Sequence, residues 1–101
     1  MRLVMAMVKP TQVESVRRAL AAVQVTRLTI CDAQGYDEPA GRLVQQTCLE
    51  IAVNEDFVDR TVKTIAAAVG TAGAPHEGQI FVMPMDEAVQ LYRTVHGPEA
   101  V

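Results

Sequence analysis

The chain has 101 residues, half of them hydrophobic, which fits one globular domain with a single modest core. A net charge of -3, the absence of a basic run and the scatter of Tyr36, Phe57, Phe81 and Tyr92 argue against a nucleic-acid surface, which needs cations and stacking aromatics. No apolar stretch approaches the roughly 20 residues that cross a bilayer, and the N-terminal one is too short for a signal peptide, so we expect a cytoplasmic protein that is not embedded in a membrane.

The N-terminal part of the chain predicts a strand followed by a helix. Residues Leu3 to Val8 form an uninterrupted apolar run that Lys9-Pro10 ends, which indicates a strand buried on both faces. Thr11 and Glu14 have the spacing of a capping box, so we expect the helix to begin there. The inner stripe of this helix recurs at helical spacing and consists of Val13, Val16, Leu20 and Val23.

A hairpin with a large tip is predicted next. The runs Val25 to Asp32 and Leu43 to Val53 are rich in β-branched and aliphatic residues. The segment between them, Gln34 to Arg42, carries Gly, Pro, Asp and Glu and is too long for a tight turn. We therefore expect a long loop there, and we expect function to centre on it.

The register of this hairpin separates two faces of the sheet. With the tip centred between Pro39 and Ala40, one face is apolar and the other is mixed. The apolar pairs are Ile30 with Leu49 and Leu28 with Ile51, and the mixed pairs are Thr29 with Glu50 and Cys31 with Cys48. Because a hydroxyl lies opposite a carboxylate on the mixed face, that face is the first candidate for a ligand site.

A second helix and a last strand follow. Asn54 is a suitable N-cap, acids occupy the first turn, and Gly70 predicts the end of the helix. Its apolar stripe consists of Val58, Val62, Ile65 and Val69. The run Gln79 to Met83, which Pro84 ends, predicts a short strand. The tail, residues 85–101, is compatible with a helical turn or an edge strand.

The order strand, helix, strand, strand, helix, strand predicts an α+β fold of ferredoxin-like βαββαβ type over residues 1–101, with two helices on one face of a four-stranded antiparallel sheet. The first and last strands are apolar on both faces, so the face opposite the helices also needs cover. We therefore expect an oligomer that forms through the open face of the sheet.

Several stretches, in order and on the expected elements, carry a family resemblance. They are Val8-Lys9-Pro10, Val16-Arg17-Arg18-Ala19-Leu20, Leu28-Thr29-Ile30 running to Gln34-Gly35-Tyr36, Leu49-Glu50-Ile51-Ala52-Val53, the segment Gly78-Gln79-Ile80-Phe81-Val82-Met83-Pro84-Met85-Asp86-Glu87-Ala88-Val89 and Glu99-Ala100-Val101. On these residues the chain resembles the PII signal-transduction family, nitrogen regulatory protein P-II and its PII-like relatives, over essentially its whole length.

The resemblance implies a homotrimer with three clefts between subunits, in which family members bind ATP or ADP. The segment after Gly35 corresponds to the T-loop, which inserts into partner enzymes and membrane transporters. The turn from Ala72 to Gln79 corresponds to the phosphate-cradling B-loop. Thr29 and Glu50 lie where the family contacts nucleotide from a neighbouring subunit, in agreement with the mixed face.

Departures from the family pattern imply a weakened grip on phosphate. The T-loop is shorter than usual and lacks the modified tyrosine near its tip, so uridylylation is not expected; Tyr36 lies at its base. Arg27 stands where the family has a small residue beside the adenine. In the B-loop, Gln79 replaces a basic residue of the family and His76 replaces a glycine. The two C-terminal arginines that bind phosphate in the family align with Gln90 and Tyr92, and Arg93 lies one residue beyond the second of these positions. Asp37 and Glu77 add negative charge near the phosphates.

The resulting hypothesis is a regulatory protein that senses a small effector and acts on a partner enzyme or transporter. The effector is an adenine nucleotide (ADP, AMP or ATP), another small anion, or a different small ligand. The candidate ligand-binding residues are Arg27, Thr29, Gly35, Glu50, Gly78, Gln79 and Arg93. The candidate partner-binding segment is the loop 35–44, with Tyr36, Asp37, Glu38 and Arg42.

Other interpretations stay open at this point. In one interpretation, Thr29 and Glu50 form a cross-strand pair that binds no ligand. Gly73 and Gly78 are then turn glycines that bind no anion. A trimeric interaction module that binds no nucleotide, similar to CutA-type proteins, is the alternative function. Cys31 and Cys48 are expected to be reduced, buried small hydrophobes. We predict neither a catalytic set nor a metal site, and an acylphosphatase-like enzyme lacks its anion-gripping loop at Lys9-Pro10-Thr11.

Overall fold

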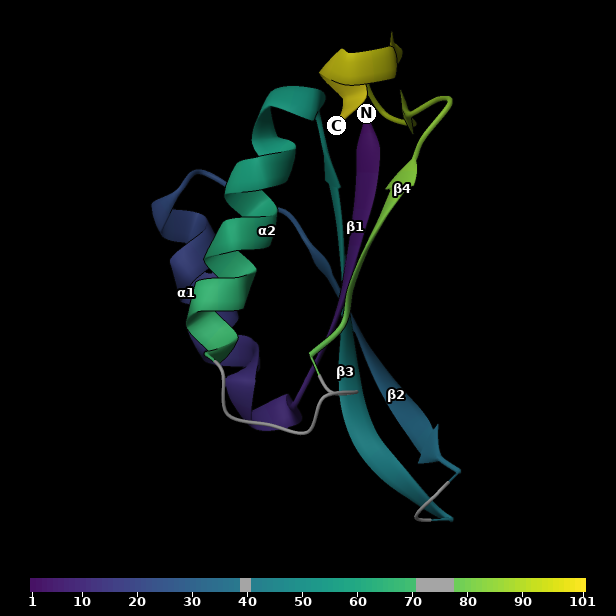
Figure 1. Cartoon of the computed structure of the whole chain (residues 1–101). Coiled ribbons are helices and arrows are strands. Elements are labelled where there is room, and N and C mark those ends of the chain that lie inside the picture. The colour runs from purple at the N-terminus through teal and green to yellow at the C-terminus, as the bar shows by residue number, and fades with distance from the viewer. Residues whose placement is uncertain (39–40, 71–77) are drawn as a thin grey trace.

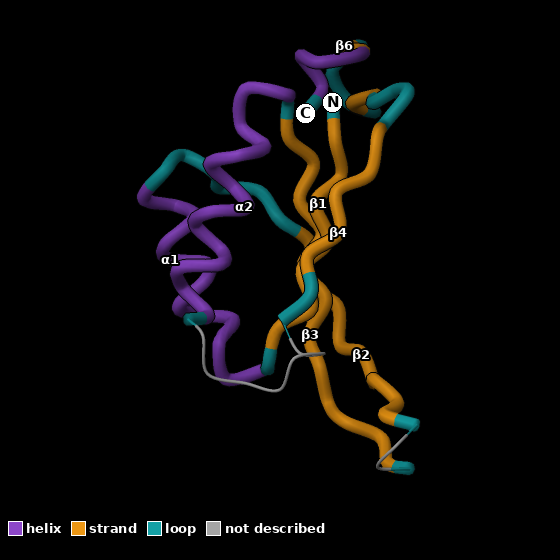
Figure 2. Tube along the Cα trace, viewed as in Figure 1, coloured by secondary structure: helices purple, strands orange, loops and turns teal. Residues whose placement is uncertain are grey.

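The fold is a four-stranded antiparallel sheet with two helices on one of its faces (Figures 1 and 2). The computed structural model describes residues 1–38, 41–70 and 78–101. The strands are ordered β2-β3-β1-β4, and a second sheet pairs β5 with β6. The elements are β1 (Arg2–Val8), the 3-10 turn η1 (Pro10–Gln12), α1 (Val13–Ala22), β2 (Thr29–Asp37), β3 (Arg42–Val53), α2 (Glu55–Val69), β4 (Ile80–Pro84), β5 (Val89–Gln90), β6 (Val95–His96) and the 3-10 turn η2 (Gly97–Ala100). The predicted α+β ferredoxin-like architecture is confirmed.

The two helices lie where their apolar stripes predict, but their N-termini are capped differently from the prediction. Thr11 does not cap α1, because Pro10 begins a 3-10 turn and the Gln12 side chain accepts a hydrogen bond from the Lys9 N–H at 2.9 Å. Asn54 is the N-cap residue of α2, but its side chain makes no cap hydrogen bond and donates instead to the Pro98 carbonyl at 2.9 Å. The predicted end of α2 is confirmed, since Gly70 adopts a φ of 72° that favours glycine.

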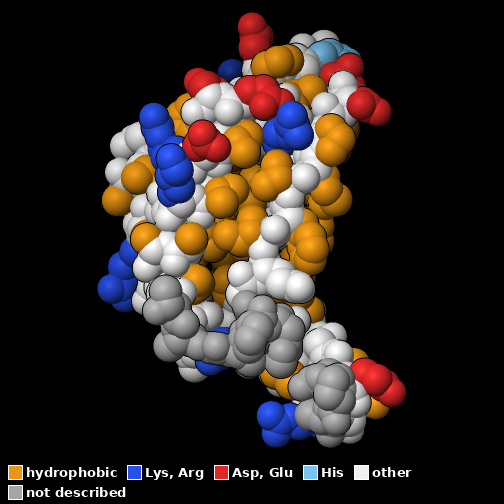
Figure 3. Space-filling model, viewed as in Figure 1, with side chains coloured by type: hydrophobic (Ala, Val, Ile, Leu, Met, Phe, Trp, Pro, Cys, Tyr) orange, Lys and Arg blue, Asp and Glu red, His pale blue; other side chains and the backbone are white. Residues whose placement is uncertain are grey.

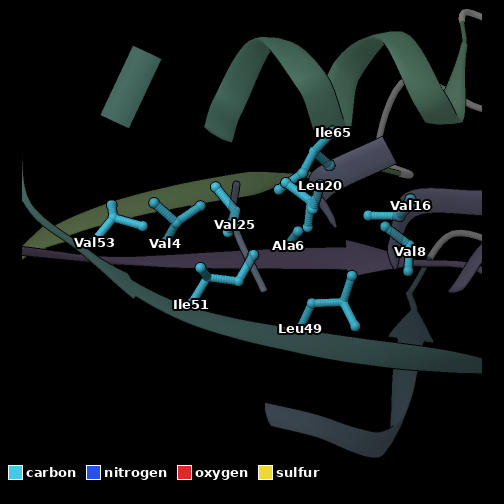
Figure 4. Packing of buried hydrophobic residues seen from close by; sticks show 10 residues of the cluster. All are labelled: Val4, Ala6, Val8, Val16, Leu20, Val25, Leu49, Ile51, Val53 and Ile65. Atoms are coloured by element: carbon cyan, nitrogen blue, oxygen red, sulfur yellow. The ribbon is translucent and has the colours of Figure 1, made fainter. Parts of the chain in front are cut away.

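One side of the sheet and the two helices enclose the hydrophobic core (Figure 4). Val4, Ala6 and Val8 of β1 alternate with residues that face the other way, as strand geometry requires. Leu49 and Ile51 of β3 lie beside them. The helices contribute Val16 and Leu20 from α1 and Ile65 from α2, all of which are buried.

The hairpin between β2 and β3 pairs over a longer range than predicted. The predicted register is confirmed for Thr29 with Glu50, Ile30 with Leu49 and Cys31 with Cys48. The predicted pair of Leu28 with Ile51 lies just outside the paired residues, because β2 begins at Thr29.

The segment expected as a loop, residues 35–44, is mostly paired strand. Pairing continues to Asp37 with Arg42, so that only residues 38–41 connect the strands, and the Gly41 N–H donates to the Glu38 carbonyl at 3.2 Å. We call residues 34–37 paired with residues 42–45 the ribbon. It extends beyond the helices at one end of a molecule that measures 47 × 25 × 20 Å (Figure 1).

The tail forms a β-hairpin. Of the two predicted alternatives, the edge strand therefore agrees better with the structure than the helical turn. β5 and β6 pair through Val89 with His96 and Gln90 with Val95, and η2 follows. The Gly97 N–H donates to the Ala88 carbonyl at 2.8 Å and to the Glu87 carboxylate at 2.9 Å, which closes this hairpin. The C-terminal hairpin lies at the end of the sheet opposite the ribbon (Figure 1).

The sheet face opposite the helices is largely apolar. By strand alternation it carries Leu3, Met5 and Met7 of β1, Cys48, Glu50 and Ala52 of β3, and Phe81 and Met83 of β4. Phe81 is 47% exposed and Met83 37% exposed. Hydrophobic side chains also appear on the surface along β4 and beside α2 (Figure 3). We call the sheet face opposite the helices the open face.

Leu49→Ala should destabilise the fold by about 2–5 kcal/mol, because the removed side chain is fully buried and leaves a cavity between sheet and helices. Leu91→Ala is the matched control, since Leu91 is 86% exposed, and its effect should stay within about 0.5 kcal/mol. Urea denaturation of both variants at one protein concentration measures the difference. Equal stability losses would contradict the position of Leu49 in the core.

The acid titration of Glu14 should depend on Arg17. Hydrogen bonds from the Arg17 guanidinium lower the pKa of the Glu14 carboxyl to about 2. Because the folded-state pKa is depressed, this interaction contributes its full stabilisation above the unfolded-state pKa and loses it as the pH falls toward 2. In Arg17→Gln the carboxyl pKa, followed by NMR, should rise toward its usual range, whereas Arg60→Gln should leave it unchanged.

Candidate functional site

A groove lies where β1 ends and β4 begins, at the root of the ribbon. Its volume is about 290 Å³, and it is lined by Met7, Val8, Lys9, Pro10, Thr11, Val44, Gln45, Gln46 and Gly78. β4 is held against β1 here, because the Met7 N–H donates to the Gln79 carbonyl at 2.9 Å. The groove therefore brings Gly78, from the predicted ligand-binding set, next to the ribbon.

Gly35 belongs to the same region because the Gln46 side chain covers it. A Cβ atom at Gly35 would lie 2.9 Å from the amide group of Gln46, which is closer than real Cβ contacts. Gly35 pairs with Val44 across the ribbon, and both Val44 and Gln46 line the groove. The glycine thus lets a side chain of β3 fold back over the backbone of β2.

Thr29 and Glu50 lie opposite each other, as predicted, on the two strands that continue into the ribbon. Glu50 is also paired with Met5 on its other side, so it is a carboxylate on an otherwise apolar stretch of the open face. The Cys31 thiol donates a weak hydrogen bond to Glu50 Oε1 at 4.0 Å. In the described part of the chain, no group of three or more Cys, His, Asp and Glu side chains is arranged to hold a metal ion.

Arg27 lies in a different hollow, at the other end of β3. This cavity has a volume of about 200 Å³ and is lined by Gln24, Val25, Thr26, Arg27, Ala52, Val53, Asn54, Phe57 and Val101. The side-chain oxygen Oδ1 of Asn54, a residue of its wall, is buried and has no hydrogen-bond partner among the described residues, although the amide nitrogen of the same side chain donates to the Pro98 carbonyl. Arg27 therefore lies in a cavity of mixed polar and apolar lining rather than in the groove.

Arg93 lies in the turn of the C-terminal hairpin and is exposed. The same turn presents Leu91, 86% exposed, and Tyr92, 98% exposed. Gln90 points back into the hairpin, where its side-chain amide donates to the Ala100 carbonyl at 3.3 Å. The cation and the aromatic ring at this turn are thus directed away from their own subunit.

A single chain does not assemble all the predicted ligand-binding residues. Gly35, Gly78 and Gln79 lie at the groove, Thr29 and Glu50 lie on the open face, and Arg27 and Arg93 lie toward the opposite end. Gln46 lines the groove and Ala52 lines the cavity, and six residues of strand separate them by about 20 Å. A ligand that touches all of them needs a second chain.

The predicted partner-binding residues lie at the far end of the ribbon. Tyr36 is 61% exposed and pairs with Leu43, which is 63% exposed. Asp37 pairs in register with Arg42, and Glu38 follows at the turn. The ribbon therefore presents an exposed apolar pair beyond the body of the domain, with the exposed Arg42 next to Leu43.

Some predicted residues lie outside the described residues. Gly73, His76 and Glu77, assigned by resemblance to the B-loop region, belong to this group. The structure does describe Gln79, which is exposed at the start of β4. Within the described ranges no helix is long and apolar enough to span a membrane.

Three polar side chains were missed by the sequence reasoning. Gln45 and Gln46 line the groove, and Asn54 carries the unpartnered buried oxygen of the cavity. A signal for the glutamines exists, because Gln45-Gln46 interrupts the alternating pattern of a predicted strand. No local signal marks Asn54, since an Asn before a helix is expected to be an N-cap.

Comparison with known proteins gives a consistent result. The family described as Nitrogen regulatory protein P-II matches residues 1–96. Nitrogen regulatory protein GlnK1 of Methanosarcina mazei is 32% identical over 114 aligned positions, which cover 100% of this chain and 97% of that protein. Nitrogen regulatory protein P-II of Rhizobium etli is 35% identical over 103 positions, which cover 90% of this chain and 91% of that protein.

A solved structure agrees with the sequence matches. The crystal structure of Arabidopsis thaliana PII bound to citrate superposes with a TM-score of 0.84 at 27% identity and covers 98% of this chain and 87% of that one. The resemblance stated from the sequence is therefore confirmed, and the CutA-like alternative is not favoured.

The contact between Gly35 and Gln46 can be tested by a double-mutant cycle. Gly35→Ala should cost about 1 kcal/mol, because the new methyl group must displace the Gln46 amide. In a Gln46→Ala background the same substitution should be neutral or stabilising, since a strand favours Ala over Gly once the space is free. Urea denaturation of the four proteins measures the coupling, and an equal cost in both backgrounds would contradict the contact.

Proposed function

Because this chain belongs to the nitrogen regulatory protein P-II family, we propose that it binds a small effector in clefts between the subunits of a homotrimer and thereby controls a partner enzyme or transporter. Effector sensing and partner regulation are the general function of this signalling family. In this proposal the chain is a cytoplasmic regulator and carries out no reaction of its own. The observation that carries the proposal is the separation of the candidate ligand residues within one chain.

The open face supports assembly. Leu3, Met5 and Met7 alternate with core residues along β1, and Phe81 and Met83 continue the apolar surface on β4. Covering such a face with a second sheet removes apolar area from water, at roughly 25 cal/mol for each Å². In the proposed trimer, the open-face residues of one subunit would lie near the groove or the C-terminal hairpin of the next.

The groove favours an effector that is held mainly by neutral hydrogen-bonding groups. Thr11, Gln45 and Gln46 provide hydroxyl and amide groups, and Lys9 provides a positive charge. Gln79, which lies beside the groove, has a neutral side chain at a position where the P-II family has a basic residue. We therefore propose an adenine nucleotide (ADP, AMP or ATP) whose phosphates contribute little to its affinity, or a small carboxylate anion. The citrate bound by the Arabidopsis relative supports the second class.

The ribbon is the proposed partner-binding element. Tyr36 and Leu43 form an exposed cross-strand pair, and such aromatic and aliphatic side chains are typical anchors at protein interfaces. Asp37, Glu38 and Arg42 lie next to this pair in the sequence, and we expect their charges to confer specificity. The ribbon begins at the groove, so an effector bound there contacts the root of the element that meets the partner.

Assembly is tested by sedimentation equilibrium at micromolar concentration. We expect the mass of three chains for the wild-type protein. Met5→Asp places a second carboxylate beside Glu50 at the middle of the open face and should shift the mass toward that of one chain. Ala67→Asp, on the exposed side of α2, is the control and should leave the mass unchanged. A monomeric wild-type chain would contradict the proposed clefts.

Effector binding is tested by calorimetry with ATP, ADP, AMP and citrate. For the wild-type protein we expect similar affinities for ATP and AMP. Gln79→Lys should raise the affinity for ATP about tenfold and that for AMP less, because a charged hydrogen bond to added phosphates contributes about 1.5 kcal/mol. Ala67→Lys adds the same charge on α2 and should change neither affinity. No heat with any of these ligands would argue against the proposed site.

A further inference from the structure

The two cysteines of this chain face each other across the strands that lead into the ribbon. Cys31 of β2 and Cys48 of β3 are direct partners in the antiparallel register. They are the only cysteines in the sequence, and both are free thiols. Neither is one of the candidate ligand-binding residues or a member of the core cluster.

The register satisfies the geometric requirement for a disulfide. Directly opposed residues of antiparallel strands have Cα atoms about 4.5–5.5 Å apart and side chains on the same face. Disulfides need a Cα separation of about 4.4–6.8 Å. The register therefore places the Cα atoms of Cys31 and Cys48 at a separation that suits a disulfide.

The surroundings make the two thiols different. Cys31 is half-buried on β2, an edge strand of the sheet, and its thiol donates to Glu50 Oε1 at 4.0 Å. Cys48 is 7% exposed, and burial, assisted by the charge of Glu50, raises the pKa of its thiol. Within one chain, Cys31 is thus the more exposed thiol and Cys48 is the protected one.

We propose that Cys31 and Cys48 form a redox-modification site that closes into an intrachain disulfide when hydrogen peroxide oxidises it. The Cys31 sulfur attacks one peroxide oxygen, the O–O bond breaks, the leaving hydroxide takes up the thiol proton as water, and sulfenic acid remains on Cys31. The Cys48 sulfur then attacks the Cys31 sulfur, the S–O bond breaks, and the hydroxide leaves with the Cys48 proton as a second water. Two thiols supply the two electrons that reduce one peroxide, and a dithiol reductant reverses the change.

The disulfide would act on two parts of the proposed effector site, the ribbon and the pair of Thr29 with Glu50. It fixes β2 to β3 at the root of the ribbon, and it removes the thiol hydrogen bond from Glu50, which pairs with Thr29. The link between oxidation state and effector affinity rests on the function proposed above. The formation of the disulfide itself does not.

The first experiment follows the thiols of the full-length protein. After treatment with peroxide, the unfolded protein should have lost both reactive thiols, and its intact mass should fall by two hydrogen atoms; dithiothreitol should restore both. Cys31→Ser and Cys48→Ala each keep a single cysteine, so neither variant can form the intrachain disulfide. The melting temperature of the oxidised wild-type protein should rise by about 5–10 °C, and neither variant should show this rise.

Two results would overturn the disulfide site. One is a wild-type pair that keeps both thiols in excess oxidised glutathione as well as in peroxide. The other is a bridge between chains, seen as linked subunits on a non-reducing gel. Because each chain has only these cysteines, either result identifies the fate of the pair without ambiguity.

The second experiment separates this inference from the proposed function. Calorimetry with AMP compares reduced and oxidised wild-type protein, with Cys31→Ser as the control that peroxide treatment should not change. A severalfold difference in affinity between the two wild-type forms supports coupling through Glu50. A disulfide that forms in a protein with no affinity for any tested nucleotide or for citrate would support the redox site and overturn the proposed function.

Discussion

The structure depends on the antiparallel register of β3 against both of its neighbours. β3 pairs with β1 on one side and with β2 on the other, so its two faces are set for the whole sheet. Leu49 and Ile51 point into the core, while Cys48 and Glu50 point to the open face. A slip of one residue would exchange these sets and bury a carboxylate under the helices. The core therefore holds the candidate site in place.

The same alternation makes the isolated subunit incomplete. The strands are apolar on both faces. One face packs against the helices, and the other leaves Met5, Phe81 and Met83 without cover from their own chain. The candidate ligand residues are divided in the same way, between the groove at the ribbon and the end of the sheet where Arg27 and Arg93 lie. Membership of a trimeric signalling family explains both features by one physical requirement, the covering of the open face.

The ribbon connects binding chemistry to an exposed recognition surface. Its root touches the groove through Val44 and Gln45, and its outer part presents Tyr36 and Leu43. The strands that carry the ribbon also carry Thr29 with Glu50 and the opposed cysteines. Changes in ligand or in thiol state at this position would act on a paired β-element rather than on an unstructured loop, which limits the motion to bending and twisting of two hydrogen-bonded strands.

The sequence by itself determined the order of elements, the helix stripes, the end of α2 at Gly70 and the pairing of Thr29 with Glu50, because each follows from local periodicity or from a glycine conformation. Only the tertiary structure decided the length of the ribbon, since Gly35 resembles a loop residue until Val44 of the facing strand pairs with it. It also decided that Asn54 bonds to Pro98 rather than capping α2, and that Gln45 and Gln46 line a groove. These outcomes depend on segments far apart in the chain, whose contacts no local pattern encodes.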